Sequence, residues 1–206
     1  MKKRSFITLI FSLFLLSAWA QQKDSTAGKW EVEAAALWYI IPYEHFVLPI
    51  VKADKDWLHL EARYNYEDKN TFSFFAGYNF NGGRKLSYTL TPMVGLVTGL
   101  SDGIAPGLEA TLALGKFELY SEMEYLIEFN NKANSYYYNW TELNFYPVDW
   151  LWFGITGQKT RVYQSSLEIQ RGFLTGFGWK QLSVTGYLFN PWMESTFGIV
   201  SVAWQF

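Results

Sequence analysis

Polar and apolar side chains alternate residue by residue along two long stretches of this chain, 57–67 and 117–129. Successive side chains of a β-strand point to opposite faces, so each stretch predicts a strand with one charged face and one apolar face. In 57–67 the charged face carries Glu61 and Arg63, and in 117–129 it is a row of glutamates. A soluble sandwich has no use for so many carboxylates on one strand face. A closed barrel that crosses a membrane accounts for both faces, with water inside and lipid outside.

The same period-two pattern recurs along the rest of the chain, whereas helical periodicity does not. Most of the runs have about the 9–11 residues that a tilted strand needs to cross a bilayer. Pro49 interrupts the weakest run, and proline cannot donate to a ladder. We expect an all-β fold, a transmembrane antiparallel up-and-down β-barrel of twelve strands, with ten or eight strands as alternatives. The expected strands are 30–40, 44–52, 57–67, 71–80, 86–98, 105–114, 117–129, 136–146, 150–160, 165–178, 182–190 and 196–206.

The N-terminal segment has the three parts of a secretory signal peptide. Residues 1–4 carry three basic side chains, residues 5–17 form an apolar run, and Ala18-Trp19-Ala20 is a small-x-small cleavage site. The apolar run is too short for a spanning helix, which argues against a membrane anchor. We therefore expect cleavage after Ala20, so that residues 1–20 are a signal peptide and 21–206 form one barrel domain.

Composition excludes several classes of protein. The chain has no cysteine, so it has no disulfide, no thiolate metal site and no lipid-modified N-terminal cysteine. Without residues 1–20, the basic residues number 14 against 19 acidic ones, which gives a formal charge near −5. This charge argues against binding to nucleic acid. One residue in five is aromatic, as expected for a barrel with an aromatic girdle at each membrane interface.

The last strand resembles the C-terminal strand of bacterial outer-membrane β-barrel proteins. It alternates a face of large apolar side chains with a face of small or polar ones, and it ends on Phe206. The resemblance implies an outer-membrane location and a surface in contact with outer-membrane lipid. It also implies that the barrel-assembly machinery recognises the terminal aromatic residue, Phe206. The oligomeric state stays open.

The inward face of the predicted barrel has many carboxylates and few cations. The candidate lumen-lining residues are Glu31, Glu33, Glu61, Arg63, Glu109, Glu118, Tyr120, Glu122, Glu124, Trp140, Glu142 and Glu168. Rings of acidic side chains select cations, which predicts a passive channel for small solutes with a cation-preferring lumen. The alternative is a closed structural barrel whose interior is filled by ion pairs.

Arg171 does not fit the pattern of its predicted strand, because it shares the outward face with Phe173 and Phe177. An arginine on the lipid face at mid-bilayer costs roughly 2–4 kcal/mol. We expect a bulge at Gly172 that turns Arg171 inward, since glycine adopts the backbone conformation that a bulge needs.

The sequence offers little support for an enzyme. Its two histidines are His45 and His59, and no serine stands at an informative spacing from His59, which we interpret as a girdle or turn histidine. Glu122 and Glu124 share a face and could bind calcium, but a structural carboxylate row explains them as well. We expect no catalytic residue, no metal and no cofactor. A lipid-modifying barrel enzyme, such as a lipid hydrolase, is the third alternative.

Overall fold

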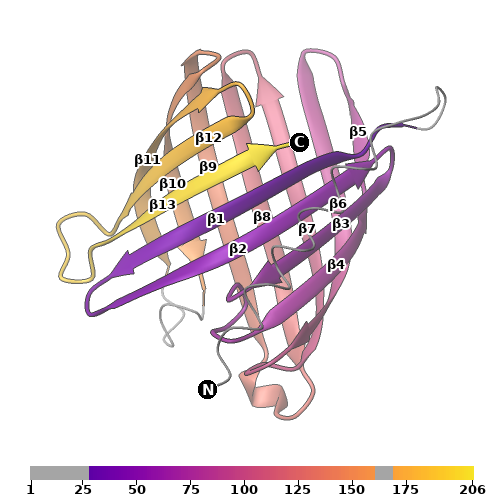
Figure 1. The fold of residues 1–206 in the computed structure, drawn as a ribbon, viewed down its shortest axis with the longest axis vertical. Coiled ribbons are helices and arrows are strands. Elements are labelled where there is room, and N and C mark those ends of the chain that lie inside the picture. Colours follow the sequence, from indigo (N-terminus) through magenta and orange to yellow (C-terminus); the bar gives the residue numbers. More distant parts are fainter. Residues whose placement is uncertain (1–27, 161–168) are drawn as a thin grey trace, which may run out of the picture.

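Antiparallel strands make up 74% of the structure, a computed structural model that describes residues 28–160 and 169–206 (Figure 1). Consecutive strands pair with each other around the sheet, except that β4 and β5 both pair with β6 and β5 has no second neighbour. The strands are β1 (Glu31–Ile41), β2 (Glu44–Lys55), β3 (Leu58–Tyr64), β4 (Phe72–Tyr78), β5 (Phe80–Gly83), β6 (Leu86–Thr98), β7 (Gly103–Leu114), β8 (Phe117–Glu128), β9 (Tyr136–Val148), β10 (Leu151–Lys159), β11 (Gln170–Trp179), β12 (Leu182–Phe189) and β13 (Phe197–Gln205). A single turn of 3-10 helix, η2 (Lys132–Asn134), lies between β8 and β9.

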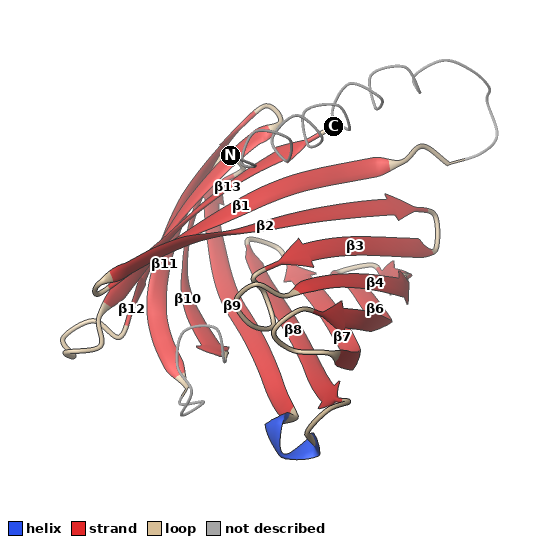
Figure 2. Ribbon diagram, turned by 60° about the horizontal axis from the view of Figure 1, so that its bottom comes forward, coloured by secondary structure: helices blue, strands red, loops and turns tan. Residues whose placement is uncertain are grey.

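Two pairings close the sheet into a barrel. β1 pairs with β13 from Glu33 opposite Gln205 to Ile40 opposite Gly198. β4 and β5 both pair with β6 and are separated only by Asn79, so they act as one strand of a twelve-stranded barrel. Figure 2 shows the strands curving around a common interior. The prediction of a closed antiparallel barrel with twelve strands is confirmed, and the alternatives of ten and eight strands are wrong.

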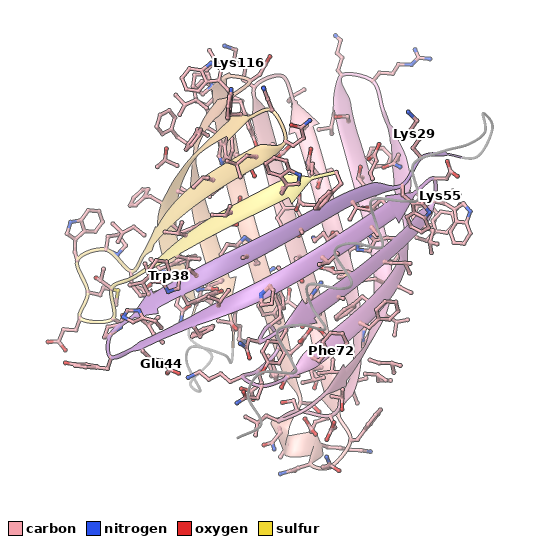
Figure 3. All side chains as sticks on the ribbon, viewed as in Figure 1. Lys29, Trp38, Glu44, Lys55, Phe72 and Lys116 are labelled. Atoms are coloured by element: carbon pink, nitrogen blue, oxygen red, sulfur yellow. The ribbon has the colours of Figure 1, made fainter. Side chains whose placement is uncertain are left out.

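The barrel has two different ends. At one end, which we call the turn end, the strands are joined by tight turns at 56–57, 84–85, 115–116, 149–150 and 180–181. We call the opposite end the loop end. Figure 3 labels Lys29, Lys55 and Lys116 near the turn end, and Trp38, Glu44 and Phe72 nearer the loop end.

Apolar side chains cover the outside of the barrel, as the alternation predicts. In β3, the residues His59, Glu61 and Arg63 are buried in the interior, while Leu58 and Leu60 on the other face are partly exposed. Large exposed apolar side chains, such as Phe74 on β4, continue the pattern around the barrel. In the described part of the chain, no helix is long and apolar enough to cross a membrane.

Pro49 does not interrupt β2, which runs without a break from Glu44 to Lys55. Pro49 lies opposite Ala36 in the ladder with β1. The ladder between β2 and β3 begins only at Ile50, so on that side the missing N–H of Pro49 costs no ladder hydrogen bond.

The prediction that one strand continues to residue 67 is wrong. β3 ends at Tyr64, and Asn65 has a φ of 61°, the left-handed conformation that asparagine tolerates better than most residues. The Nδ2 of Asn65 donates a hydrogen bond to the carbonyl oxygen of Val47 at 3.0 Å. The chain therefore turns into the barrel, and Tyr66, which the alternation placed toward lipid, is buried in the interior.

The expected bulge at Gly172 is absent. The β10–β11 ladder runs in regular register from Gln158 opposite Gln170 to Leu151 opposite Phe177, and Arg171 is exposed on the outside. Arg171 is the second residue of β11 at the loop end, where a lipid-facing charge near the interface costs only about 0–1 kcal/mol. The predicted signal peptide at 1–20 and the first residues of the strand predicted at 165–178 lie outside the described residues.

Candidate functional site

An arginine bridges the interior of the barrel from β3 to β8. The Nη1 of Arg63 lies 2.7 Å from the Oε1 of Glu122 and 3.0 Å from the Oε2 of Glu124. Its Nη2 donates to the Oε2 of Glu61 at 2.8 Å. Strands β4, β6 and β7 separate β3 from β8 in the sheet, so the contacts with Glu122 and Glu124 cross the lumen.

Aromatic rings and a further glutamate enclose the guanidinium of Arg63. Its central carbon lies 4.3 Å from the ring centroid of Tyr66 and 4.2 Å from that of Phe75, within cation–π range. Glu67, in the segment between β3 and β4, lies 3.8 Å from Nη1. Burial raises the pKa of the Glu67 carboxyl, and the positive charge of Arg63 opposes this rise. Arg63 and Phe75 are 1% and 0% exposed, so the bridge is shielded from water.

Lys52 on β2 is the second cation of the interior. Its Nζ lies 2.5 Å from the Oε1 of Glu109 on β7 and 3.8 Å from the Oε1 of Glu61. It also donates to the hydroxyl of Tyr120 at 3.2 Å, and that hydroxyl lies 3.2 Å from the Oε2 of Glu122. Lys52 is thereby connected to the carboxylates that bind Arg63. We call this set the Arg63 cluster; it consists of Lys52, Glu61, Arg63, Glu67, Glu109, Glu122 and Glu124.

The Arg63 cluster contains more carboxylates than cations. Five glutamates surround one lysine and one arginine, so carboxylates outnumber cations by three. Carboxylates held this close repel one another unless cations or protons compensate them.

Aromatic side chains line the interior between β9 and β12, and we call this region the aromatic wall. Trp140 on β9 packs edge-on against Tyr187 and Phe189 of β12, at centroid distances of 5.3 and 5.7 Å. Trp140 Nε1 and the hydroxyl of Tyr187 both donate to the Oε1 of Glu142, at 2.8 and 2.9 Å. The hydroxyl of Tyr39 on β1 donates to Gln158 on β10 at 3.4 Å, a second contact across the lumen.

A polar pocket of about 510 Å³ lies at the turn end. Its lining includes Lys52, Asp54, His59, Asn79 and Glu109, so the pocket reaches the Arg63 cluster from this side. His59 is 2% exposed, and its Nδ1 lies 2.8 Å from the Oδ1 of Asp54. The interpretation of His59 as a girdle or turn histidine is therefore wrong, because its side chain belongs to the interior.

The structure brings about half of the predicted lumen residues together and places the others apart. Glu61, Arg63, Glu109, Tyr120, Glu122 and Glu124 form or contact the Arg63 cluster. Trp140 and Glu142 lie on the aromatic wall. Glu118 accepts a hydrogen bond from the hydroxyl of Tyr146 at 3.2 Å. Glu31 lines the turn-end pocket, Glu33 accepts from Gln205 at 3.4 Å, and Glu168 lies outside the described residues.

The sequence prediction missed Lys52, although this residue neutralises part of the cluster. The expected strand ended at Lys52, and its inward face carries the apolar residues Phe46, Leu48 and Ile50 before it. The alternation of Lys52 with Asp54, both of which line the turn-end pocket, was the available signal. This alternation can be recognised only when the predicted strand is extended to Lys55.

Comparison with solved structures identifies the fold of the barrel. The chain is similar to a KdgM porin, with a TM-score of 0.62 and 12% sequence identity over 85% of this chain and 99% of the porin. It is also similar to a KdgM porin in complex with disordered oligogalacturonate, with a TM-score of 0.60 and 12% identity over the same shares of the two chains. The chain has the fold of a KdgM porin. The predicted fold, that of a bacterial outer-membrane β-barrel protein, is thereby confirmed.

The comparisons with sequences give no closer relative. No protein-family model matches the chain, and no curated protein matches it. Since the identity to the porins is low, the similarity establishes the barrel and leaves the lumen to be interpreted from its own residues.

Proposed function

We propose that this protein is an outer-membrane channel for small solutes whose lumen narrows at the Arg63 cluster and prefers cations. The observation that carries the proposal is the bridge of Arg63 to Glu122 and Glu124, within a cluster of five carboxylates and two cations that reaches across the lumen. Acidic side chains at a constriction attract cations and repel anions. The turn-end pocket gives water and small solutes access to one side of this constriction.

The charge of the lumen also bears on the class of solute. One of the similar structures is a porin in complex with oligogalacturonate, a chain of sugar acids and hence an anion. The carboxylate excess of the Arg63 cluster disfavours such a polyanion. We propose small cations or neutral sugars as the solutes of this channel instead.

A closed structural barrel is the second candidate function. Burial favours it: Arg63, Glu61, Glu124 and Phe75 are no more than 1% exposed. A network of this kind stabilises a barrel with or without a permanent water path. The two candidates differ in one measurable property, which is whether ions cross the folded protein.

Planar-bilayer recording of the refolded protein under a salt gradient tests the proposal. A steady conductance with a cation-biased reversal potential is expected for the channel. A folded, heat-modifiable protein without current would support the closed barrel, and an anion-biased reversal potential would contradict the acidic constriction.

We also propose that residues 1–20 are removed on export and that the protein is not an enzyme. The mass of the protein purified from outer membranes tests the first proposal, because cleavage after Ala20 leaves Gln21 at the N-terminus. Release of fatty acid from phospholipid by the purified barrel would contradict the second.

A further inference from the structure

Three side chains of metal-binding type meet where the turn-end pocket reaches the Arg63 cluster. His59 and Glu61 come from β3, and Glu109 comes from β7. One potential ligand atom from each of the three lies within 4.8 Å of the others, and all three residues are buried. Strands β4 and β6 separate β3 from β7, so closure of the barrel brings Glu109 to the other two.

One nitrogen of the His59 imidazole contacts Asp54, and the other makes no hydrogen bond. Its Nδ1 lies 2.8 Å from Asp54, which fixes the ring. Its Nε2 makes no hydrogen bond, although His59 is 98% buried. The Oε1 of Glu61 makes no hydrogen bond either. Buried polar atoms without partners are rare and call for a ligand or a specific cause.

The geometry at this nitrogen suits a zinc ion. Zinc binds histidine nitrogen and carboxylate oxygen at about 2.0–2.2 Å, so two tetrahedral ligands stand roughly 3.3–3.6 Å apart. The Nε2 of His59 and the Oε2 of Glu61 are 3.6 Å apart, and this oxygen also accepts a hydrogen bond from the Nη2 of Arg63 at 2.8 Å. Metal-binding histidines commonly donate their other nitrogen to a carboxylate, as His59 can to Asp54. The pocket beside them leaves room for a water molecule as a fourth ligand.

We propose that His59, Glu61 and Glu109 bind a zinc ion at the floor of the turn-end pocket, with Asp54 as the residue that positions His59. The two carboxylates balance the charge of the ion. The pocket supplies the access route from solvent, which a metal site inside a barrel requires.

Lys52 competes with the ion in this arrangement. Its ammonium group lies 2.5 Å from Glu109 and 3.8 Å from Glu61, close to where the charge of the metal would sit. The Lys52 side chain is 20% exposed and lines the pocket, so it can withdraw toward solvent when the ion binds. Removal of this ammonium group, as in Lys52→Gln, should therefore tighten zinc binding several-fold.

Calorimetric titration of the refolded, tag-free barrel with zinc chloride in a non-chelating buffer tests the site. We expect one ion per chain, a loss of at least tenfold in affinity for His59→Ala, and a loss of about tenfold or more for Asp54→Asn. The chain has two histidines, and His45 is exposed on β2, so His45→Ala is the matched control with unchanged affinity. Heat modifiability shows whether each variant has folded.

A second measurement uses the unmodified protein. Cobalt chloride added to the wild-type barrel should produce intense visible absorption bands of four-coordinate cobalt, and zinc should abolish them. The proposal is overturned if the wild type binds no zinc, or if His59→Ala and His45→Ala bind it equally well. In that case His59 is the centre of a simple ion-pair network with Asp54 and Glu61. Neither outcome bears on ion conductance, which tests the proposed function separately.

Discussion

At the scale of single residues, Arg63 links β3 to β8 across the interior through its ion pairs with glutamates. It lies within 4.0 Å of four glutamates, and it is almost completely buried. A buried charge is tolerated only when it is paired, and removal of one partner leaves the others desolvated and uncompensated. The bridge therefore makes the barrel sensitive to changes at a single side chain.

Arg63→Met should destabilise the barrel by about 3–5 kcal/mol, because it removes the cation that four buried carboxylates share. Equilibrium unfolding in urea, followed by heat modifiability or tryptophan fluorescence, measures this loss. Lys69→Met is the matched control: Lys69 pairs with Glu44 at 2.5 Å, but both side chains are at least one-third exposed. A surface pair of this kind contributes only about 0–1 kcal/mol. Equal destabilisation by the two substitutions would show that the Arg63 bridge has no special role.

At the scale of elements, the tight turns and the closing strand pair determine whether the barrel forms. Gly83 at the end of β5 has a φ of 95°, and Gly115 between β7 and β8 has a φ of 60°. Both occupy the left-handed half of conformational space, which glycine enters without penalty. The two turns differ in the space around the glycine. Substitution of each glycine therefore distinguishes the cost of backbone strain alone from the cost of strain combined with a steric clash.

Gly83→Ala should reduce folding far more than Gly115→Ala. A Cβ at Gly83 would lie 1.9 Å from the carbonyl oxygen of Leu86, whereas a Cβ at Gly115 meets nothing within 4 Å. Gly115→Ala should then cost only the left-handed conformation, about 1–2 kcal/mol. The yield of heat-modifiable barrel after refolding compares the two variants. Similar yields would mean that the β5–β6 turn can rearrange.

Deletion of Phe206 should lower the amount of protein in the outer membrane while leaving refolding in detergent intact. The resemblance of the last strand to the C-terminal strands of outer-membrane barrels implies that the assembly machinery recognises Phe206. In the barrel, the backbone N–H of Phe206 donates to the carbonyl oxygen of Val32 at 2.9 Å, and the side chain is exposed. Quantitative blotting of outer-membrane fractions measures the effect, with Phe206→Tyr as the control that keeps an aromatic end. Wild-type levels for the deletion would contradict this role.

At the scale of the whole molecule, the barrel combines an apolar exterior with an interior that is divided into layers. The turn-end pocket lies at one end, the Arg63 cluster follows, and apolar side chains such as Leu126 and Val97 fill the interior toward the loop end. A solute that passes through must displace or pass between these side chains. Ion selectivity is therefore expected to depend on the charge of the cluster more than on the rims.

Glu122→Gln together with Glu124→Gln should reduce the cation preference of the current across the barrel. The double substitution removes two of five carboxylates from the cluster while keeping their shape. The reversal potential in a tenfold salt gradient should move toward zero. Glu194→Gln, an exposed residue in the loop after β12, is the control with unchanged reversal potential. An unchanged value in the double variant would remove Glu122 and Glu124 from the conduction path.

The sequence by itself determined the class of fold and the inward faces of the strands predicted at 57–67 and 117–129, and it favoured twelve strands over ten or eight. It could do so because a membrane barrel has opposite environments on its two faces, which imposes a period of two on every strand. The positions of Glu61, Arg63, Glu122 and Glu124 on the inner face follow from this period alone.

Only the tertiary structure decided which of these side chains meet. Arg63 and Glu122 stand on strands separated by three others, and no local pattern encodes a contact across the lumen. The inward turn after Tyr64, which buries Tyr66 beside Arg63, depends on Asn65 reaching the backbone of Val47 on β2. Arg171 remains on the outside because it lies near the loop end of its strand. The alternation of side chains predicts the face of a residue but not its depth in the membrane. The period of two fixes the face of a residue, whereas its depth and its partners depend on how the closed barrel brings distant strands together.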